Sequence, residues 1–516
     1  MNTNALIETI NYKYTYYSML KNFHGYNVVK SYQAKKHKKR FKMTGYMKAV
    51  IAAIVSIIIA LLPTESFGIE DLNPVQQRVI SIFVFAAVMW LTEAIPSWCT
   101  SVLIIVVMLC TISTGSLTCF KGVEDAIYVP YKDIMHCFAD PTILLFIGGF
   151  ILAIGMTKTR LDVVSARILL KPFGTKSETV LLGFIVVTAI FSAFVSNTAT
   201  AAMMLAFLTP VLKAMPEGSK DRTALALAIP LGANIGGIAT PIGTPPNTIV
   251  LGYRNETLGV SISFGEWMIK MVPFVVILLL AGWCLLRFLF PFQQKKIELN
   301  IEGAFHSTTQ SWIVIVTFAV TVFLWCFGKI DGVWDLGLNS NIIALIPVAA
   351  FAITGVITRH DLEEINWSVL WMVAGGFALG VALNTTKLSN VLVASIPFSE
   401  WSPLLVMIIA SLVCFGFSNF ISHSAAASLL VPVLGVVAGA MASAGTITDG
   451  GVSQMLICVA IASSVSMILP ISTPPNAIAH STGFIQQSEM MKVGIIVGLL
   501  GLVIGLAWVK LPFIFG

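Results

Sequence analysis

Long apolar runs separated by short polar stretches fill the chain from residue 47 to its end. A membrane-spanning helix needs about 20 mostly apolar residues, and the strong candidates are residues 47–62, 78–93, 98–112, 142–157, 268–290, 311–327, 342–358, 368–384 and 491–512. The pattern predicts an all-α polytopic membrane protein.

Four further stretches are apolar but are interrupted by small, polar or proline residues: 178–215, 224–253, 403–438 and 453–484. Residues 178–215 and 403–438 have the length of a helical hairpin that enters and leaves the membrane on one side. The other two can each cross once with an interruption. The sequence therefore predicts about 11 transmembrane helices, two of them discontinuous, plus two re-entrant helical hairpins.

Composition agrees with this prediction, since 57% of the 516 residues are hydrophobic and only 11% are charged. A soluble domain carries about 25% charged residues, so both a soluble enzyme and a disordered chain are excluded. The net charge of +6 belongs to one end: residues 1–48 hold ten Lys or Arg and one acid, Glu8. We interpret residues 1–46 as a cytoplasmic tail that touches anionic lipid, rather than as a nucleic-acid site.

Loop charges predict the orientation. With a cytoplasmic N-terminus, the loop 158–177 lies inside and carries five Lys or Arg, whereas the outer loops 63–77 and 438–452 carry none. This agrees with the positive-inside rule. The prediction is a multi-pass protein of the plasma or inner membrane with its C-terminus outside. Eight scattered cysteines form no metal motif, although Cys119 and Cys137 share a loop and can pair in an oxidising compartment.

The chain repeats itself at a displacement of 226 to 229 residues. Three blocks recur in the same order: Gly-Gly-Phe at 148–150 and 375–377, SAFVSNT at 192–198 with SNFISHS at 418–424, and PIGTPPN at 241–247 with PISTPPN at 470–476. An odd number of spans between the copies inverts the second copy. Inverted repeats are typical of secondary transporters, which bind their substrate where the repeats meet.

The repeated motifs suit ion and anion binding. Two consecutive prolines open a helix; the freed carbonyls can hold a small hard cation, and the next helix N-terminus attracts an anion. The alternative is that Ser and Thr only pack between helices, as small residues do. Four motifs in symmetric pairs favour binding, whereas the Gly-Gly-Phe pair favours close helix packing.

No Lys or Arg lies between Lys176 and Lys213 or between Lys387 and Lys492. The negative charge of an anion bound at the SAFVSNT and SNFISHS motifs therefore has to be compensated by helix termini or by bound cations, which favours cation coupling.

These motifs, with Trp90-Leu91-Thr92-Glu93-Ala94-Ile95-Pro96, resemble the divalent anion:sodium symporter family over residues 47–516. The resemblance implies a homodimer that works as an elevator. It divides the chain into scaffold helices (47–177 and 293–402) and two halves of a transport domain (178–292 and 403–516).

The resemblance also implies the sites. The first sodium site takes Ser192, Ser196, Asn197 and Gly243, and the second takes Ser418, Ile421, His423 and Ser472. The substrate carboxylates meet Ser196, Asn197, Thr198, Thr244, Ser422, Ser424 and Thr473, with His423 beside them.

His423 departs from the family, whose second motif is normally Ser-Asn-Thr. Imidazole offers nitrogen where the amide offered oxygen, and sodium favours oxygen. The second cation site is therefore open, and the alternative is that the ring bonds a backbone carbonyl. We interpret His480, beyond Asn476, as a structural helix residue.

The sequence favours a symporter of a C4-dicarboxylate such as succinate, malate or fumarate, with sodium as coupling ion and no other cofactor. The alternatives within transport are a sulfate or other oxyanion carrier, and a dicarboxylate exchanger with weak sodium dependence. An anion channel is the alternative of another class. No nucleophile–base pair or phosphate-binding loop suggests an enzyme.

Overall fold

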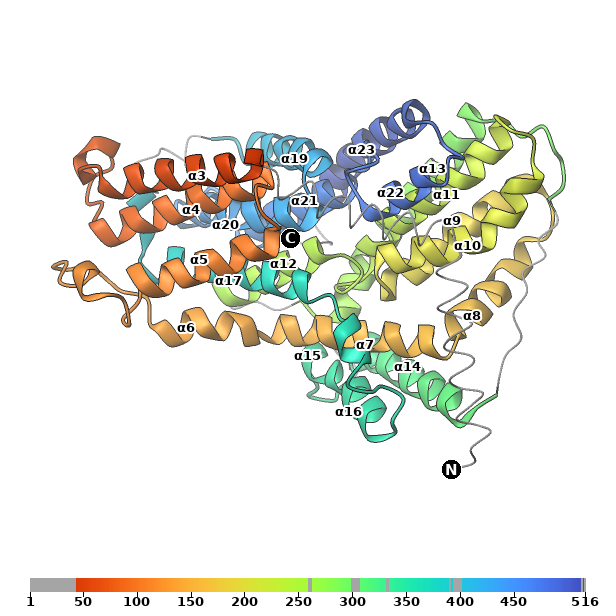
Figure 1. The fold of residues 1–516 in the computed structure, drawn as a ribbon, viewed down its shortest axis with the longest axis horizontal. Helices are drawn as coiled ribbons and strands as arrows, with labels where there is room; N and C mark the ends of the chain where they lie inside the picture. Colours follow the sequence, from red (N-terminus) through yellow and green to blue (C-terminus); the bar gives the residue numbers. More distant parts are fainter. Residues whose placement is uncertain are drawn as a thin grey trace.

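A computed structural model describes residues 43–258, 262–297, 307–330, 334–388, 391–392, 401–511 and 514. Most of the predicted basic tail, residues 1–42, lies outside the described residues. Nearly all regular structure in the described part is helical (Figure 1), which confirms the predicted all-helical class.

The described residues from 43 to 289 form eleven α-helices and five 3₁₀ turns. The α-helices are α3 (Met43–Leu61), α4 (Pro74–Thr92), α5 (Ser97–Thr111), α6 (Tyr131–His136), α7 (Pro141–Lys158), α8 (Leu161–Leu170), α9 (Ser177–Phe194), α10 (Asn197–Ala214), α11 (Lys220–Gly236), α12 (Pro245–Leu258) and α13 (Phe264–Leu289). The 3₁₀ turns are η1 (Thr64–Phe67), η2 (Thr118–Phe120), η3 (Cys137–Ala139), η4 (Lys171–Phe173) and η5 (Gly237–Ala239).

The second part repeats this order with fewer connecting elements. It contains α14 (Thr309–Phe327), β1 (Lys329–Ile330), β2 (Trp334–Asp335), α15 (Ser340–Ile343), α16 (Leu345–Ile353), η6 (Asp361–Glu364), α17 (Trp367–Thr385), α19 (Pro403–Phe420), α20 (His423–Ser443), α21 (Asp449–Ser464), α22 (Pro474–Ser481) and α23 (Gln487–Val509). The two short strands pair antiparallel, with Lys329 opposite Asp335. This small hairpin lies in a loop and was not predicted.

Ten helices in the described part are long and apolar enough to cross a membrane, and both arms of each predicted hairpin except α10 are among them. Three shorter apolar helices cover residues 45–61, 97–111 and 340–353. The protein is therefore a multi-pass membrane protein. The predicted arrangement of eleven spans and two re-entrant hairpins stays a prediction.

The predicted span 342–358 is shorter and is broken in the structure. Helices α15 and α16 meet at Ala344, and Gly355 has φ +69°. Pro347 has no N–H to donate to the carbonyl of Ile343, which explains the break. The left-handed backbone of Gly355 follows the end of α16, a common helix termination.

The Gly-Gly pairs allow close helix packing, as the sequence predicted. A side chain on Gly148 would collide with Ala344, and one on Gly375 would collide with Ser101 of α5. Their neighbours Gly149 and Gly376 lie close to Ile242 and Ser428 respectively. Each pair thus lets one helix approach two other segments.

Helix α17 lies in the middle of the fold and packs against α5, α12 and α20. Figure 1 shows α9 and α10 side by side, and α3 beside α4. Cys119 and Cys137 are both free, the former exposed and the latter buried, so the predicted option of a disulfide is not realised.

Candidate functional site

The first SNT motif lies where the chain turns between α9 and α10. Only Val195 and Ser196 connect the two helices, and Ser196 caps α10 by accepting a hydrogen bond from Ala199 N at 3.2 Å. Asn197 points back along the preceding helix, because its Oδ1 lies 2.6 Å from Ser192 Oγ. The motif therefore combines a helix N-terminus with a cluster of side-chain oxygens.

The Ser192 hydroxyl serves two acceptors. Its Oγ also lies 2.7 Å from the carbonyl oxygen of Ala233 in α11. A hydroxyl has one hydrogen to donate, so one of the two acceptor oxygens is always left without it. The Ala233 carbonyl also accepts from the backbone N–H of Gly237, so the Ser192 hydrogen can go to Asn197. Three oxygen atoms thus gather here, and oxygen is the ligand that a small hard cation prefers.

Gly237 and Gly243, in the break between α11 and α12, lie next to this oxygen cluster. A Cβ on Gly237 would stand 2.8 Å from Asn197 Oδ1 and 3.1 Å from the Gly243 carbonyl oxygen. Any side chain at Gly237 would therefore displace Asn197 or Gly243. Three predicted residues of the first sodium site, Ser192, Asn197 and Gly243, lie together here, and Ser196 precedes Asn197 in the chain.

Asn247 holds the first helix break open. Its Nδ2 donates to the carbonyls of Gly237 (3.1 Å), Ile238 (3.3 Å) and Thr240 (2.8 Å). The Thr240 hydroxyl donates to the Ala193 carbonyl and so ties the break to α9. An amide thus replaces the donors that the broken helix lacks, as buried backbone carbonyls require.

The second break is built in the same way. Asn476 Nδ2 donates to the carbonyls of Met467 (2.8 Å) and Leu469 (3.1 Å), and Thr473 caps α22 by accepting from Asn476 N at 3.2 Å. The sequence analysis did not assign a role to either asparagine. Their recurrence at the end of both TPPN blocks was the signal that could have revealed one.

The second SNT-like motif differs in its chemistry. Ser422 caps α20 as Ser196 caps α10, accepting from Ala425 N at 3.2 Å. The Nε2 of His423 lies 2.7 Å from the carbonyl oxygen of Ser466, which confirms the alternative in which the ring bonds the backbone. A carbonyl only accepts, so Nε2 carries the hydrogen, and in a neutral ring Nδ1 can accept but not donate.

Side chains fill the positions that are glycines in the first half. Ser466 corresponds to Gly237, and its Oγ lies 2.7 Å from the Ala462 carbonyl oxygen and 3.1 Å from the Phe415 carbonyl oxygen, so its one hydrogen goes to either of them. Ser472 corresponds to Gly243, and its Oγ donates to the backbone carbonyl of Asn419 at 2.9 Å. Internal donors therefore satisfy carbonyls in this half.

Asn419 is a further residue that the sequence analysis missed. Its Oδ1 accepts from Ile468 N at 2.9 Å and lies 3.2 Å from Ser472 Oγ. The corresponding residue in the first half is Ala193, so the second half has an amide on the hairpin arm instead of at the tip. Ser418 and Ile421 are buried nearby, and Ser418 Oγ lies 3.8 Å from Cys414 Sγ.

At the site, helices of one repeat pack against helices of the other. Helix α10, which begins at the first motif, packs against α22, which follows the second TPPN block. Helix α12, which follows the first TPPN block, packs against α20, which begins at the second motif. Thr244, Ser424 and Thr473 are buried, whereas Ser196, Asn197, Thr198 and Ser422 are partly exposed.

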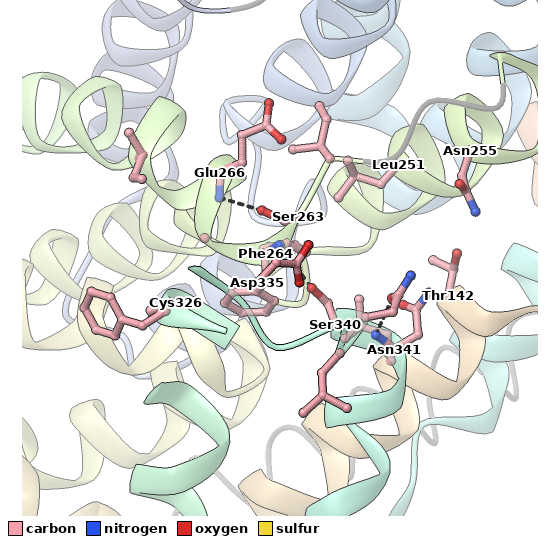
Figure 2. Close-up of a pocket in the computed structure, with 18 of the residues that line it drawn as sticks. Thr142, Leu251, Asn255, Ser263, Phe264, Glu266, Cys326, Asp335, Ser340 and Asn341 are labelled. Carbon is pink, nitrogen blue, oxygen red and sulfur yellow. Dashed lines mark hydrogen bonds between the residues drawn. The ribbon is translucent and has the colours of Figure 1, made fainter. Parts of the chain in front are cut away.

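A cavity of about 580 Å³ opens beside the first break (Figure 2). Its walls come from α7, α12, α13, α14, α15 and the loop after β2, and they include Glu266, Asp335 and Asn341. Pro241, the first residue of PIGTPPN, belongs to the wall, but none of the predicted site residues does. This cavity is therefore distinct from the predicted site.

Two carboxylates outside the spans have perturbed environments. Burial raises the pKa of Asp361, but hydrogen bonds from Lys158 and Thr358 outweigh it and lower the pKa overall. Burial raises the pKa of Asp162 to about 6, although Val163 N and Thr157 donate to its carboxylate. In the described part of the chain, no three His, Cys, Asp or Glu side chains gather as metal ligands.

Broken helices, paired polar motifs and an apolar helical body define a transporter and not an enzyme. The chain belongs to the citrate transporter family (CitMHS), whose family model matches residues 87–449.

Its relatives are bacterial and fungal transporters. The sodium-dependent dicarboxylate transporter SdcS of Staphylococcus saprophyticus is 28% identical over 503 residues, which cover 91% of this chain and 92% of the relative. An uncharacterized transporter of Haemophilus influenzae is 31% identical over 470 residues, covering 87% and 95%.

Two solved structures share the fold. The YdaH transporter of Alcanivorax borkumensis, whose structure was described as having an unusual topology, aligns with a TM-score of 0.52 at 13% identity over 80% of this chain and 98% of its own. MtrF of Neisseria gonorrhoeae, described as one of a class of antimetabolite efflux pumps, aligns with a TM-score of 0.53 at 14% identity over 85% and 98%.

Proposed function

We propose that the protein is a secondary active transporter that couples uptake of a C4-dicarboxylate to sodium. The observation that carries the proposal is the oxygen cluster of Ser192, Asn197 and Ala233 at the N-terminus of α10. A cation bound there lies beside a helix terminus that attracts a carboxylate. Binding of the anion then depends on the cation.

The first sodium site takes oxygens from Ser192, Ser196, Asn197 and Gly243. The Ser192 hydroxyl gives its one hydrogen to a neighbour and keeps its oxygen lone pairs for the sodium. The proposed second site is Ser418, Ile421, His423 and Ser472, where the Ser472 hydroxyl is bonded to Asn419 and the Nε2 of His423 is bonded to Ser466. A cation there has to displace these bonds.

The substrate lies between the helix N-termini of the two repeats. The hydroxyl and amide groups of the first half bind one carboxylate, and those of the second half bind the other. These residues are Ser196, Asn197, Thr198 and Thr244 in the first half, and Ser422, His423, Ser424 and Thr473 in the second. A neutral His423 has no free N–H for a carboxylate, so the hydroxyls are the donors of that half.

The proposed mechanism is an elevator within a homodimer. Residues 47–177 and 293–402 form the scaffold, and 178–292 and 403–516 form the transport domain with its inner and outer hairpins. Eleven spans and two re-entrant hairpins place the basic tail 1–46 in the cytoplasm and the C-terminus outside the cell membrane. The close approach of Gly149 to Ile242 and of Gly376 to Ser428 supports this division.

A dicarboxylate exchanger with weak sodium dependence is the second candidate. The internal hydrogen bonds of Ser466, Ser472 and His423 favour it, because a half-site satisfied by its own donors gains less from a cation.

Uptake of labelled succinate into proteoliposomes tests both candidates. Accumulation that needs an inward sodium gradient supports the symporter, and accumulation driven only by internal dicarboxylate supports the exchanger. Downhill, unsaturable flux would overturn both and indicate a channel. Competition by citrate, sulfate and phosphate identifies the substrate class.

A further inference from the structure

Asn234 and Asn476 link the two broken helices next to their breaks. Asn234 lies in the last turn of α11 and Asn476 in the first turn of α22, and both are at most 2% exposed. The Nδ2 of Asn234 donates to the Oδ1 of Asn476 at 3.1 Å. This bond joins residues that are 242 positions apart and belong to different repeats.

The orientation of both amides follows from their neighbours. Asn476 uses Nδ2 for the carbonyls of Met467 and Leu469, so its Oδ1 is the atom left for Asn234. Rotating the Asn234 amide by 180° would set two oxygens against each other. The Oδ1 of Asn234 is buried without a hydrogen-bond partner among the described residues. A buried amide oxygen without a hydrogen-bond donor destabilises the fold, so this orientation is held by the bond to Asn476 and not by the Oδ1 of Asn234.

The matching pair of the other repeat makes no such link. Ser463 corresponds to Asn234, and Asn247 corresponds to Asn476. The Ser463 hydroxyl donates to the Ala460 carbonyl of its own helix at 3.0 Å. The Oδ1 of Asn247 has no partner among the described residues. The two breaks are therefore joined by the bond from Asn234 to Asn476, and the symmetry-related positions Ser463 and Asn247 provide no second bond of this kind.

This link completes a path between the two halves. Asn234 follows Ala233, whose carbonyl lies 2.7 Å from the Ser192 hydroxyl that contacts Asn197. Asn476 holds Met467, which follows Ser466, the partner of His423. A shift of α11 on cation binding would reach the second loop through the two asparagines.

We propose that Asn234 and Asn476 are positioning residues that couple cation binding in the first half to substrate binding in the second half. The inference rests on the proposed function, because it needs a cation-dependent substrate affinity. Neither residue touches the ion or the substrate. Contiguity alone does not demonstrate coupling, so the test measures the coupling itself.

The test compares Asn234→Ser with Ser463→Ala. Asn234→Ser gives the first half the residue of the second half and removes the link, whereas Ser463→Ala changes the matching position where no link exists. The measurement is the KM for succinate in proteoliposomes at low and at saturating sodium. The ratio of the two KM values reports the coupling between cation and substrate.

We expect Asn234→Ser to lower this ratio about fivefold while the maximal rate changes less than twofold. Ser463→Ala should keep the wild-type ratio. An Asn476→Ser variant, which also loses the bonds to Met467 and Leu469, should lower the ratio at least as far. Adding Asn234→Ser to it should lower the ratio no further, because the link is already absent. Equal ratios in wild type and Asn234→Ser, or fully additive effects, would overturn the inference.

A wild-type protein without sodium-stimulated uptake would overturn the proposed function instead. In that case thermal unfolding with and without sodium decides on the link. Stabilisation by sodium that is lost in Asn234→Ser and kept in Ser463→Ala supports the coupling. Equal stabilisation in all three proteins, or none in any, overturns it.

Discussion

The side-chain oxygen of Asn197 lies 2.6 Å from the hydroxyl oxygen of Ser192, across the turn between α9 and α10. The corresponding residues of the second half, His423 and Ser418, instead contact Ser466 and Cys414 respectively. The repeat thus preserves the backbone of the two motifs but not their ligands. The first half has an oxygen cluster at this place, and the second half has hydrogen bonds to its own backbone.

Asn197→Ala should raise the sodium concentration for half-maximal uptake by roughly tenfold or more. The variant removes one oxygen of the proposed sodium site and one proposed substrate contact, and a polar contact in a dry site contributes about 1–3 kcal/mol. Sodium titration of succinate uptake measures the effect. Thr179→Ala, at the partly exposed start of α9, is the matched control. Wild-type sodium dependence in a folded Asn197→Ala protein would remove Asn197 from the site.

His423→Asn should raise the cooperativity of sodium activation. An asparagine at this position offers an amide oxygen instead of a ring nitrogen, and sodium favours oxygen ligands. The Hill coefficient for sodium should rise, provided that the Ser466 carbonyl is released by the loss of the imidazole N–H. His480→Asn is the control, because it makes the same substitution in α22, outside the motif at residues 418–424. Superimposable sodium curves for wild type and His423→Asn would show that the ring has a packing role.

The helical class, the positions of most helices and the two breaks could be predicted from the sequence. Twenty-residue apolar runs have few alternatives in a membrane, and a Pro-Pro pair inside such a run must open the helix. The close packing of Gly148 against Ala344 and of Gly375 against Ser101 could also be predicted, because only glycine permits such an approach.

The hydrogen-bond partners could not be predicted. Asn419 corresponds to Ala193 in the first half, and His423 corresponds to Asn197. A comparison of the two halves therefore points to residue 423 as the place of the second amide, and not to residue 419. The link from Asn234 to Asn476 joins residues 242 positions apart, whereas the corresponding Ser463 donates to Ala460 of its own helix. Such choices depend on side-chain reach, which a motif does not encode.

Asn247→Ala should destabilise the protein by about 2–5 kcal/mol. The two amide hydrogens are shared among three buried carbonyls of the first break, of which Ile238 also accepts from Trp267 Nε1. The Gly237 and Thr240 carbonyls lose a side-chain donor in the variant, and each loss costs about 1–3 kcal/mol, partly recovered by relaxation. Thermal unfolding in detergent measures the loss. Asn255→Ala, at the exposed end of the same helix, should unfold like wild type. Equal melting temperatures for Asn247→Ala and wild type would show that the break is held by other contacts.

Lys158→Met should destabilise the protein most clearly near neutral pH. Lys158 Nζ lies 2.6 Å from Asp361 Oδ2, and this oxygen also accepts from Thr358 N and Thr358 Oγ1. These bonds lower the pKa of Asp361, so their contribution is present above about pH 4 and is lost as the pH falls through the lowered value.

The loss in Lys158→Met should be about 1–2 kcal/mol at pH 7 and smaller at pH 3–4, because the hydrogen bonds to charged Asp361 contribute only while it is ionised. Chemical unfolding at the two pH values measures it. Lys171→Met, an exposed position in η4, controls for the loss of a positive charge. A loss that is equal at both pH values would contradict the ion pair as its cause.

Asp162→Asn should stabilise the protein above pH 6. Asp162 is 8% exposed at the start of α8, and burial raises its pKa to about 6 even though Val163 N donates to Oδ1 at 2.8 Å. The unfolded chain releases this proton near pH 4. Between about pH 4 and 6 the unfolded state therefore binds fewer protons than the folded state, and stability falls as the pH rises. Above pH 6 the penalty is constant, on the order of 1–3 kcal/mol.

Asparagine keeps the oxygen that accepts from Val163 and has no charge to bury, so it removes the penalty and flattens this part of the pH curve. Unfolding at pH 4, 6 and 8 measures the effect, and the gain in stability should be near zero at pH 4 relative to its value at pH 8. Glu217→Gln, an exposed position in the loop before α11, should leave the curve unchanged. If Asp162→Asn shifts stability by the same amount at all three pH values, the carboxylate is not the group that titrates.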